Sequence, residues 1–388
     1  MKKKILAITG IRSEYDILYP VLKEFQGNDK FELEIVVTGA HLSDWHGFTL
    51  NKIEEDGFDV VEKIDYLLMT NRKTQRSKGV GLLIEGLTQA VDRIKPDIMI
   101  FVGDREESIS TCIVGNYMDV LVAHIGGGDP VYGNADDPIR IACSKLAHVH
   151  FTTAATYAEN LRKIGEEEFR ICFSGNPALN NILETPVIDK RNLGDFLNLD
   201  IDNNKYLVVL KHPLSSEVEE SYNQMKITME SLKDFALLNN IKIIGIYPNT
   251  DPGSYEIINV IDESCNENIK FFKTLPRNIF VNIMRNALCL VGNSSMGILE
   301  APFYKLPVVN IGNRQMGRLN AGNVEFVQYD KSEIIEAVSK ACFDEDYRIM
   351  VSNLVNPYGD GFAHKKIVSF LEKIDLNDRK WYVKRKLI

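Results

Sequence analysis

The stretch from Ile98 to Arg140, IMIFVGDREESISTCIVGNYMDVLVAHIGGGDPVYGNADDPIR, decides the fold. It contains two short apolar runs, 98–102 and 120–125, and each is followed by a polar turn that contains glycine. Short runs rich in Ile and Val and bounded by Gly predict buried parallel strands, with the segment between them as the crossover helix. The stretch therefore predicts an α/β fold with a doubly wound parallel sheet.

Polar side chains gather where these two strands end, which is where ligands bind in an open α/β sheet. They are Asp104, Arg105, Glu106 and Glu107 at the first strand, and His124, Asp129, Asp136 and Asp137 at the second. Carboxylates close to one another raise each other's pKa, so one is protonated while its neighbour is ionised near neutral pH. The group therefore predicts acid/base chemistry, with His124 orienting a sugar or sharing a proton. Asp136-Asp137-Pro138 fits a plain helix cap almost as well.

Length and composition bound the kind of protein. A chain of 388 residues predicts two domains. The net charge of −9 argues against a general nucleic-acid surface. The six cysteines are scattered without metal-ligand spacing, and no apolar run is long enough for a secretion signal or a membrane span. We expect a cytoplasmic enzyme with reduced thiols, no bound metal and no cofactor.

The strand–helix pattern runs through the chain twice. We expect a first Rossmann-like domain over residues 1–185, a second over 186–372, and a tail, 373–388, that packs back on the first domain. In detail, we expect a helix from about Tyr15 capped by Ser13, a loop over 69–79, a polar connection over 184–205, and helices only after the strand 307–311. Two such domains facing each other would hold a ligand in the cleft between them.

The segment from Gly292 to Gly297, GNSSMG, lies between a predicted strand and a predicted helix. Such a turn points backbone N–H groups and the positive end of the helix dipole at a ligand, and a diphosphate suits it. Ser294 and Ser295 add hydroxyl donors, although a serine here is more commonly an N-cap. Glu300 either accepts the hydroxyls of a ribose or is an ordinary acid of the first turns.

Cationic and imidazole side chains also follow strands. His212 precedes Pro213 at a strand end, where it is either half-buried or a donor to a phosphoryl oxygen. Arg12, Arg105, Arg314 and Arg318 lie after strands and would supply positive charge to the same anion.

The ordered set of motifs resembles the UDP-N-acetylglucosamine 2-epimerase family over nearly the whole chain. The motifs are GIRSEY (10–15), GDR (103–105), HI with the following glycines (124–128), DDPIR (136–140), HP (212–213), PNTD (248–251), GNSS (292–295) and GNRQMGR (312–318). The resemblance implies a GT-B-like fold of two Rossmann-like domains, with the nucleotide held mostly by the second. The RSEY start and the His-Ile-x-Gly-Gly stretch are similar to the hydrolysing branch.

In that branch UDP leaves by elimination across C1–C2, and water then adds to the 2-acetamidoglycal. The resemblance implies UDP-N-acetylglucosamine as substrate, and UDP and N-acetylmannosamine, an entry to sialic acids, as products. Asp104 and Asp136 are carried over as acid/base residues, with Asp129, His124 and His212 as further catalytic candidates. The implied substrate-binding residues are Arg12, Arg105, Asn249, Asp251, Ser294, Ser295, Glu300, Arg314 and Arg318. A homodimer is implied as well.

One residue departs from the family pattern. Hydrolysing members commonly carry Glu after His-Ile, and this chain has Gly126, which cannot transfer a proton. Either Asp129 or His124 replaces that Glu, or the substrate is a UDP- or GDP-linked 2,4-diacetamido-2,4,6-trideoxyhexose. A non-hydrolysing 2-epimerase, a GT-B glycosyltransferase and an inactive nucleotide-sugar sensor stay open, because one fold hosts many activities.

Overall fold

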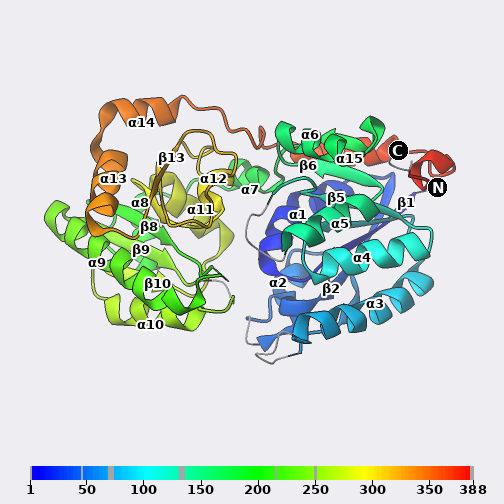
Figure 1. Cartoon of the computed structure of the whole chain (residues 1–388), viewed down its shortest axis with the longest axis horizontal. Helices are drawn as coiled ribbons and strands as arrows, with labels where there is room; N and C mark the ends of the chain where they lie inside the picture. The colour runs from blue at the N-terminus through cyan, green and yellow to red at the C-terminus, as the bar shows by residue number, and fades with distance from the viewer. Residues whose placement is uncertain are drawn as a thin grey trace. The chain divides into compact units, whose positions relative to one another are not determined.

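The computed structural model describes residues 2–44, 47–68, 74–130, 136–214, 216–248 and 251–384, without the side chain of Asp136. They form two compact units, one made of residues 1–183 and 358–388 and the other of residues 184–357 (Figure 1). The α/β fold class is confirmed, since each unit is built on a parallel sheet with helices on both faces.

The first unit contains a seven-stranded sheet in the order β3-β2-β1-β4-β5-β6-β7. Its strands are β1 Lys3–Thr9, β2 Phe31–Thr38, β3 Val60–Ile64, β4 Ile98–Val102, β5 Leu121–Ile125, β6 Val149–Thr152 and β7 Ile171–Phe173. Its helices are α1 Arg12–Gln26, α2 Leu50–Glu55, α3 Thr74–Ile94, α4 Glu106–Tyr117, α5 Asp136–Leu146, α6 Ala155–Lys163, α7 Ala178–Glu184 and α15 Ala363–Glu372.

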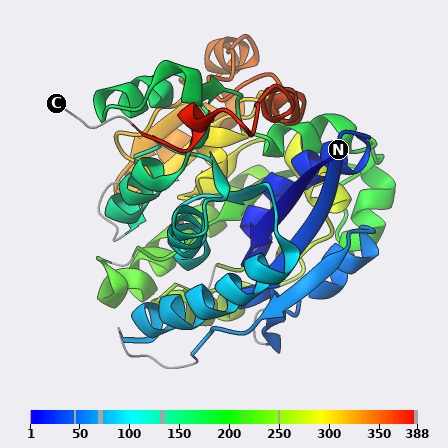
Figure 2. The same ribbon diagram turned by 90° about the vertical axis from the view of Figure 1, so that its right-hand side faces the viewer.

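Alternation along β1 divides the core of the first unit. Ile5 and Ala7 face one apolar cluster with α1, α15 and Trp381, while Leu6 and Ile8 face another with α3. The C-terminal segment, red in Figures 1 and 2, therefore belongs to the first unit. The expected second domain reached residue 372. The structure ends the second unit at residue 357 instead, because the apolar face of α15 packs on α1.

The second unit contains a six-stranded sheet in the order β10-β9-β8-β11-β12-β13. Its strands are β8 Lys205–Leu210, β9 Ile241–Ile246, β10 Ile269–Phe272, β11 Leu290–Gly292, β12 Val308–Ile311 and β13 Val324–Val327. Its helices are α8 Lys190–Leu197, α9 Ser221–Asn239, α10 Ser254–Ser264, α11 Arg277–Asn286, α12 Met296–Leu299, α13 Lys331–Phe343 and α14 Glu345–Ser352. Helices α9, α10 and α13 cover one face, and α8 and α11 the other.

Four local expectations were wrong. Helix α1 begins at Arg12 after Ile11, so Ser13 lies inside its first turn and is not the N-cap. Residues 74–79 are helical, because Gly79 and Leu83 bury one face of α3; residues 69–73 lie outside the described part. The polar connection contains α8, whose Leu193 and Leu197 are buried, and β13 adds an edge strand beside β12.

Within the part of the chain that the structure describes, no helix has both the length and the apolar character needed to cross a membrane. All six cysteines are free thiols.

Candidate functional site

In the first unit, the loops that follow β1, β4 and β5 lie at the point where the strand order changes direction. Strand β1 pairs with β4, and β4 with β5, all parallel, so their carboxyl ends lie along the same edge. The Gly103 N–H donates to the carbonyl of Ile125 at 3.0 Å, which ties two of the loops together. Ligands of open α/β sheets bind at such a switch point.

Arg140 holds two of the predicted catalytic carboxylates together. Its guanidinium, on α5, pairs with Asp104 after β4, and its Nη1 lies 3.2 Å from Asp129 Oδ2 after β5. Nη1 also donates to the backbone carbonyl of Asp129 at 2.9 Å. All three side chains are mostly buried, which strengthens charge-assisted hydrogen bonds. The structure thus brings Asp104 and Asp129 to one cation. Asp136 is the first residue of the same helix, but its side chain lies outside the described part.

His124 is buried below this edge. Its Nε2 lies 2.8 Å from the carbonyl of Gly103, and its ring stacks on Phe101 with centroids 4.7 Å apart. Burial, with the charges of His150 and Arg140, lowers the pKa of His124 well below its usual value, although the bond to Gly103 opposes this. A neutral imidazole in this place holds the backbone that precedes Asp104.

Glu107 and Glu14 form a second acidic group in the first unit. The sequence did not show that these two residues lie together. Glu107 is buried, and its Oε1 accepts a hydrogen bond from the Tyr66 hydroxyl at 2.6 Å. Burial raises the pKa of Glu107, and burial together with the Glu107 charge raises that of Glu14 well above its usual value. Although desolvation opposes it, these carboxylates raise the pKa of Arg105. The positive charge of Arg105 thus interacts with carboxylates of the first unit.

Gly10 makes this arrangement possible. A Cβ at position 10 would lie 1.6 Å from Glu107 Oε1, so only glycine lets the β1–α1 loop approach that carboxylate. Arg12, two residues later, forms a half-exposed ion pair with Asp16 at 3.6 Å. The Arg12 side chain is 39% exposed.

In the second unit, Asn293 joins the loops after β8 and β11, which are again at the switch point of the sheet. Its side chain accepts a hydrogen bond from the His212 N–H at 2.7 Å and donates to the His212 carbonyl at 2.8 Å. The close approach requires Gly292, where φ is +138° and a Cβ would lie 2.1 Å from the carbonyl oxygen of Leu210.

Cationic side chains lie around the hydrogen-bonded pair of Asn293 and His212. Arg314 and Gln315, after β12, both donate to the Asn293 carbonyl at 3.0 Å, and Arg318 donates to Gln315 Oε1 at 2.9 Å. Desolvation and the charge of Arg318 lower the pKa of Arg314, which Asp251 opposes. Arg314, Arg318 and Asp251 are therefore electrostatic neighbours.

Lys211 is a buried cation of the same edge. Its Nζ donates to the Tyr329 hydroxyl at 2.9 Å, and desolvation lowers its pKa to about 7. Desolvation, with the charges of Arg314 and Lys211, lowers the pKa of His212 to about 3, so His212 is a neutral donor at pH 7. An anion beside this edge would face Lys211, Arg314 and Arg318, an arrangement suited to a diphosphate.

The serine turn differs from the expectation. Ser295 is the N-cap residue of the helix that follows but forms no capping bond with its side chain, and Ser294 Oγ accepts from the Met296 N–H at 3.4 Å within the turn. Helix α12 covers only Met296–Leu299, so it contributes little dipole, and Glu300 is its C-cap. Asn249 lies outside the described residues.

Sequence reasoning missed Arg140, Asn293, Gln315 and Lys211 as site residues, although all four lie in or beside the quoted motifs. The sequence did not show which side chains contact each other. No spacing rule, for example, shows that Arg140 reaches loops after two different strands. Among the described residues, no group of three or more His, Cys, Asp or Glu side chains is arranged to hold a metal ion.

Residues 23–372 match the family model described as UDP-N-acetylglucosamine 2-epimerase. A Campylobacter jejuni protein named GDP/UDP-N,N'-diacetylbacillosamine 2-epimerase (hydrolyzing) is 33% identical over 326 residues, which cover 83% of this chain and 84% of that protein. A Legionella pneumophila protein named UDP-N,N'-diacetylbacillosamine 2-epimerase (hydrolyzing) is 31% identical over 380 residues, 98% of each chain. A solved Methanocaldococcus jannaschii structure, titled UDP-GlcNAc 2-epimerase in complex with UDP-GlcNAc and UDP, has a TM-score of 0.77 at 20% identity and covers 95% of this chain and 99% of that one.

Proposed function

Because the chain belongs to the UDP-N-acetylglucosamine 2-epimerase family, we propose that it is a hydrolysing nucleotide-sugar 2-epimerase. In the proposed reaction a base removes the proton from C2 of a 2-acetamido sugar while the C1–O bond to the nucleoside diphosphate breaks. Water then adds to the glycal: its hydroxyl bonds to C1, and a proton returns to C2 on the opposite face. The products are the nucleoside diphosphate and the free 2-epimeric sugar.

The observation that carries this proposal is the Asp104–Arg140–Asp129 group. Elimination and rehydration require a base and an acid at C2, and two carboxylates held by one guanidinium provide them in fixed positions. Gly126 has no group to transfer a proton, so Asp129, three residues later, takes that role. Asp136 is the third acid/base residue, and His124 keeps the Gly103 carbonyl, and with it Asp104, in place.

The departing diphosphate requires positive charge and hydrogen-bond donors. In the proposal Lys211, Arg314 and Arg318 of the second unit supply the charge, and His212 donates a neutral N–H to a phosphoryl oxygen. Arg12 adds a cation from the first unit. The nucleotide contacts carried over by resemblance to Asp251, Ser294, Ser295, Glu300 and Asn249 are kept as part of the proposal.

The sugar is proposed to be UDP-linked N,N'-diacetylbacillosamine, a 2,4-diacetamido-2,4,6-trideoxyhexose. The names of the two relatives that are 31–33% identical support this choice. A protein of Neisseria meningitidis named UDP-N-acetylglucosamine 2-epimerase is 28% identical, and UDP-N-acetylglucosamine is therefore the second substrate to test.

The test is product analysis by NMR in D2O with UDP-N,N'-diacetylbacillosamine, its GDP counterpart and UDP-N-acetylglucosamine. The expected result is free nucleoside diphosphate and a free 2-epimeric sugar with deuterium at C2, formed fastest from the UDP-linked diacetamido sugar. Accumulation of the epimeric sugar nucleotide without free sugar would indicate a non-hydrolysing enzyme. Transfer to an added acceptor would indicate a glycosyltransferase. If all three substrates stay intact, the proposal is wrong.

A variant separates chemistry from binding. Asp104→Asn keeps the shape of the side chain and removes its basicity, so turnover should fall by about 100-fold or more. UDP affinity, measured by calorimetry, should stay unchanged, because Asp104 is not one of the residues proposed to bind the diphosphate.

A further inference from the structure

A buried arginine holds the end of the chain against the first unit. Arg170 is fully buried, and its Nη1 donates to the carbonyls of His148 at 3.1 Å and Trp381 at 2.7 Å. Its Nη2 donates to the carbonyl of Val383 at 2.9 Å and to that of Lys380. Because three of these four bonds go to backbone carbonyls of residues 380–383, they fix the path of the C-terminal segment just before Lys384.

Lys384 completes the C-terminal end of α5. A helix leaves its last four carbonyls without partners inside the helix. The Cys143 carbonyl accepts from the Ala147 N–H at 2.7 Å, and that of Leu146 accepts from Asn116 Nδ2 at 2.9 Å. The two between them, on Ser144 and Lys145, accept from Lys384 Nζ at 3.1 and 2.8 Å. A cation at this end of a helix also interacts favourably with its dipole.

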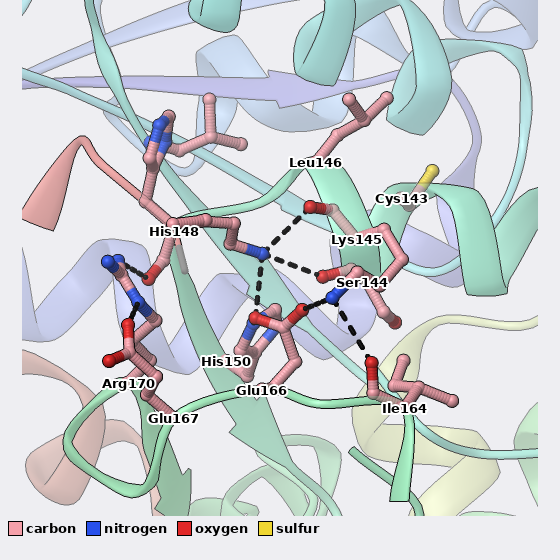
Figure 3. Close-up of polar contacts among 12 residues, drawn as sticks. Cys143, Ser144, Lys145, Leu146, His148, His150, Ile164, Glu166, Glu167 and Arg170 are labelled. Carbon is pink, nitrogen blue, oxygen red and sulfur yellow. Dashed lines mark hydrogen bonds and ion pairs between the residues drawn. The ribbon is translucent and has the colours of Figure 1, made fainter. Parts of the chain in front are cut away.

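Glu166 fixes the ammonium of Lys384 in this place. Its Oε2 lies 2.7 Å from Lys384 Nζ and 3.0 Å from His150 Nε2. Its Oε1 lies 2.7 Å from Lys145 Nζ, and Figure 3 shows Glu166 beside Lys145 and His150. The Glu166 side chain is 1% exposed, so it is a buried carboxylate whose partners leave its charge compensated. Although burial opposes it, His150 and Lys384 lower the pKa of Glu166 to about 2.

Arg140 lies on the same helix, α5, on the N-terminal side of Ser144. Four residues separate Arg140 from Ser144, about one helical turn or 6 Å. A shift of α5 along its axis would therefore move the guanidinium relative to Asp104 and Asp129 by the same amount. A second connection runs across the sheet, because His150 on β6 is the register partner of His124 on β5, which holds the Gly103 carbonyl.

The geometry points to Lys384 as a positioning residue for the reaction: by capping α5 it sets where Arg140 holds Asp104 and Asp129. This inference rests on the proposed function for its kinetic test. Lys384 touches no reacting atom in this scheme, and its effect passes through the helix.

The kinetic test compares Lys384→Met, Lys384→Arg and the control Lys380→Met in the full chain, at a temperature where each variant is folded. Lys380 lies in the same segment and pairs with Asp378 at the surface. Lys384→Met should lower kcat by about 10- to 100-fold, because small misplacements of catalytic groups have effects of that size. KM should change less than about 3-fold, and Lys384→Arg should restore most of kcat, because a guanidinium can cap both carbonyls. Lys380→Met should behave as wild type.

A double variant shows whether the effect passes through Arg140. In an Arg140→Lys background, Lys384→Met should lower kcat by less than about 2-fold, since coupled residues are not additive. A purely structural anchor would lower Tm and leave kcat of the folded protein alone. Wild-type kcat in Lys384→Met, or full additivity with Arg140→Lys, overturns the inference.

Hydrogen exchange tests the same inference without turnover. In Lys384→Met, amides of residues 136–146 should exchange about 10-fold faster, while those of α13 in the second unit stay unchanged. Faster exchange confined to residues 379–384 overturns the positioning role. If wild type hydrolyses no sugar nucleotide, the proposed function fails, and the exchange result still decides whether Lys384 holds α5.

Discussion

Gly10 offers the sharpest test of how the first unit is packed. In Gly10→Ala, the new Cβ would lie 1.6, 2.1 and 2.7 Å from Oε1, Cδ and Cγ of Glu107. Contacts that short are impossible, so the Glu107 carboxylate must leave its position. It is 2% exposed and bonded to the Tyr66 hydroxyl at 2.6 Å, so it has no solvent to move into and loses its hydrogen bond.

Two terms set the size of the effect. Overpacking a filled interior costs about 1–3 kcal/mol. Loss of a buried hydrogen bond to a carboxyl group costs about 1–2 kcal/mol more. We therefore expect Gly10→Ala to lower the free energy of unfolding of the first unit by about 3 kcal/mol. In a Glu107→Ala background the methyl group enters vacated space, and the same substitution should cost less than about 1 kcal/mol.

The assay is urea unfolding followed by tryptophan fluorescence. Trp381 is buried in the first unit, so a change in its fluorescence reports the unfolding of that unit. Gly81→Ala is the matched control, because Gly81 lies in α3 with nothing within 4 Å of a Cβ. It should stabilise by about 0.5–1 kcal/mol, the ordinary gain from alanine in a helix.

The result that would refute this reasoning is a cost for Gly10→Ala that is the same in both backgrounds. It would mean that Glu107 does not occupy the space beside Gly10. An unchanged stability of Gly10→Ala in the wild-type background would lead to the same conclusion.

Three further predictions concern pH and the site. Burial lowers the pKa of His41 to about 4, so as pH falls below about 6.5 the unfolded chain takes up a proton that the folded chain excludes. The free energy of unfolding, measured by urea titration, should therefore fall between pH 7 and 5, and replacing His41 by Gln should remove about 2 kcal/mol of this loss. If the free energy of unfolding of the variant depends on pH as steeply as that of wild type, the prediction is wrong. Arg140→Met should lower kcat by about 100-fold with UDP affinity unchanged, and Arg140→Lys should recover only part, because an ammonium cannot hold two carboxylates in a fork; kcat within about 3-fold of wild type argues against the clamp. Lys211 loses its charge as pH rises through about 7, so the UDP affinity of wild type relative to Lys211→Met should fall about 5- to 10-fold between pH 6 and 8 by calorimetry, and a constant ratio excludes Lys211 from the anion site.

Much of the fold was predictable because strand periodicity is a local signal. The run at 98–102 became strand β4 with the same bounds, and the strands expected at 120–125 and 307–311 became β5 and β12, each one residue shorter at its start. Residues 74–79 were not predictable in the same way. Most of their side chains are polar, and Gly79 and Leu83 are the residues that bury this face of α3. The helical periodicity can therefore be recognised only when the packing of the helix is known.

The site shows a similar division. The motifs located Asp104, Asp129, His212, Arg314 and Arg318 at strand ends, where the sheet topology places them. They did not show that Arg140 joins two loops, because this contact spans different strands and depends on the placement of α5. The motifs also did not show that Glu14 and Glu107 lie near Arg105, since these residues come together only in the folded chain.

By itself, the sequence determined the two parallel sheets, the loops at their carboxyl ends and the family to which the chain belongs. These follow from alternation, glycine positions and ordered motifs, all of which are local. Tertiary structure decided which charged side chains interact. Arg140 pairs with Asp104 and Asp129, Arg105 interacts with the buried glutamates, and Lys384 pairs with Glu166. The last of these pairings joins residues that are 218 positions apart in the chain, Glu166 and Lys384. The energies of such pairings depend on distance and burial, which exist only once the chain has folded.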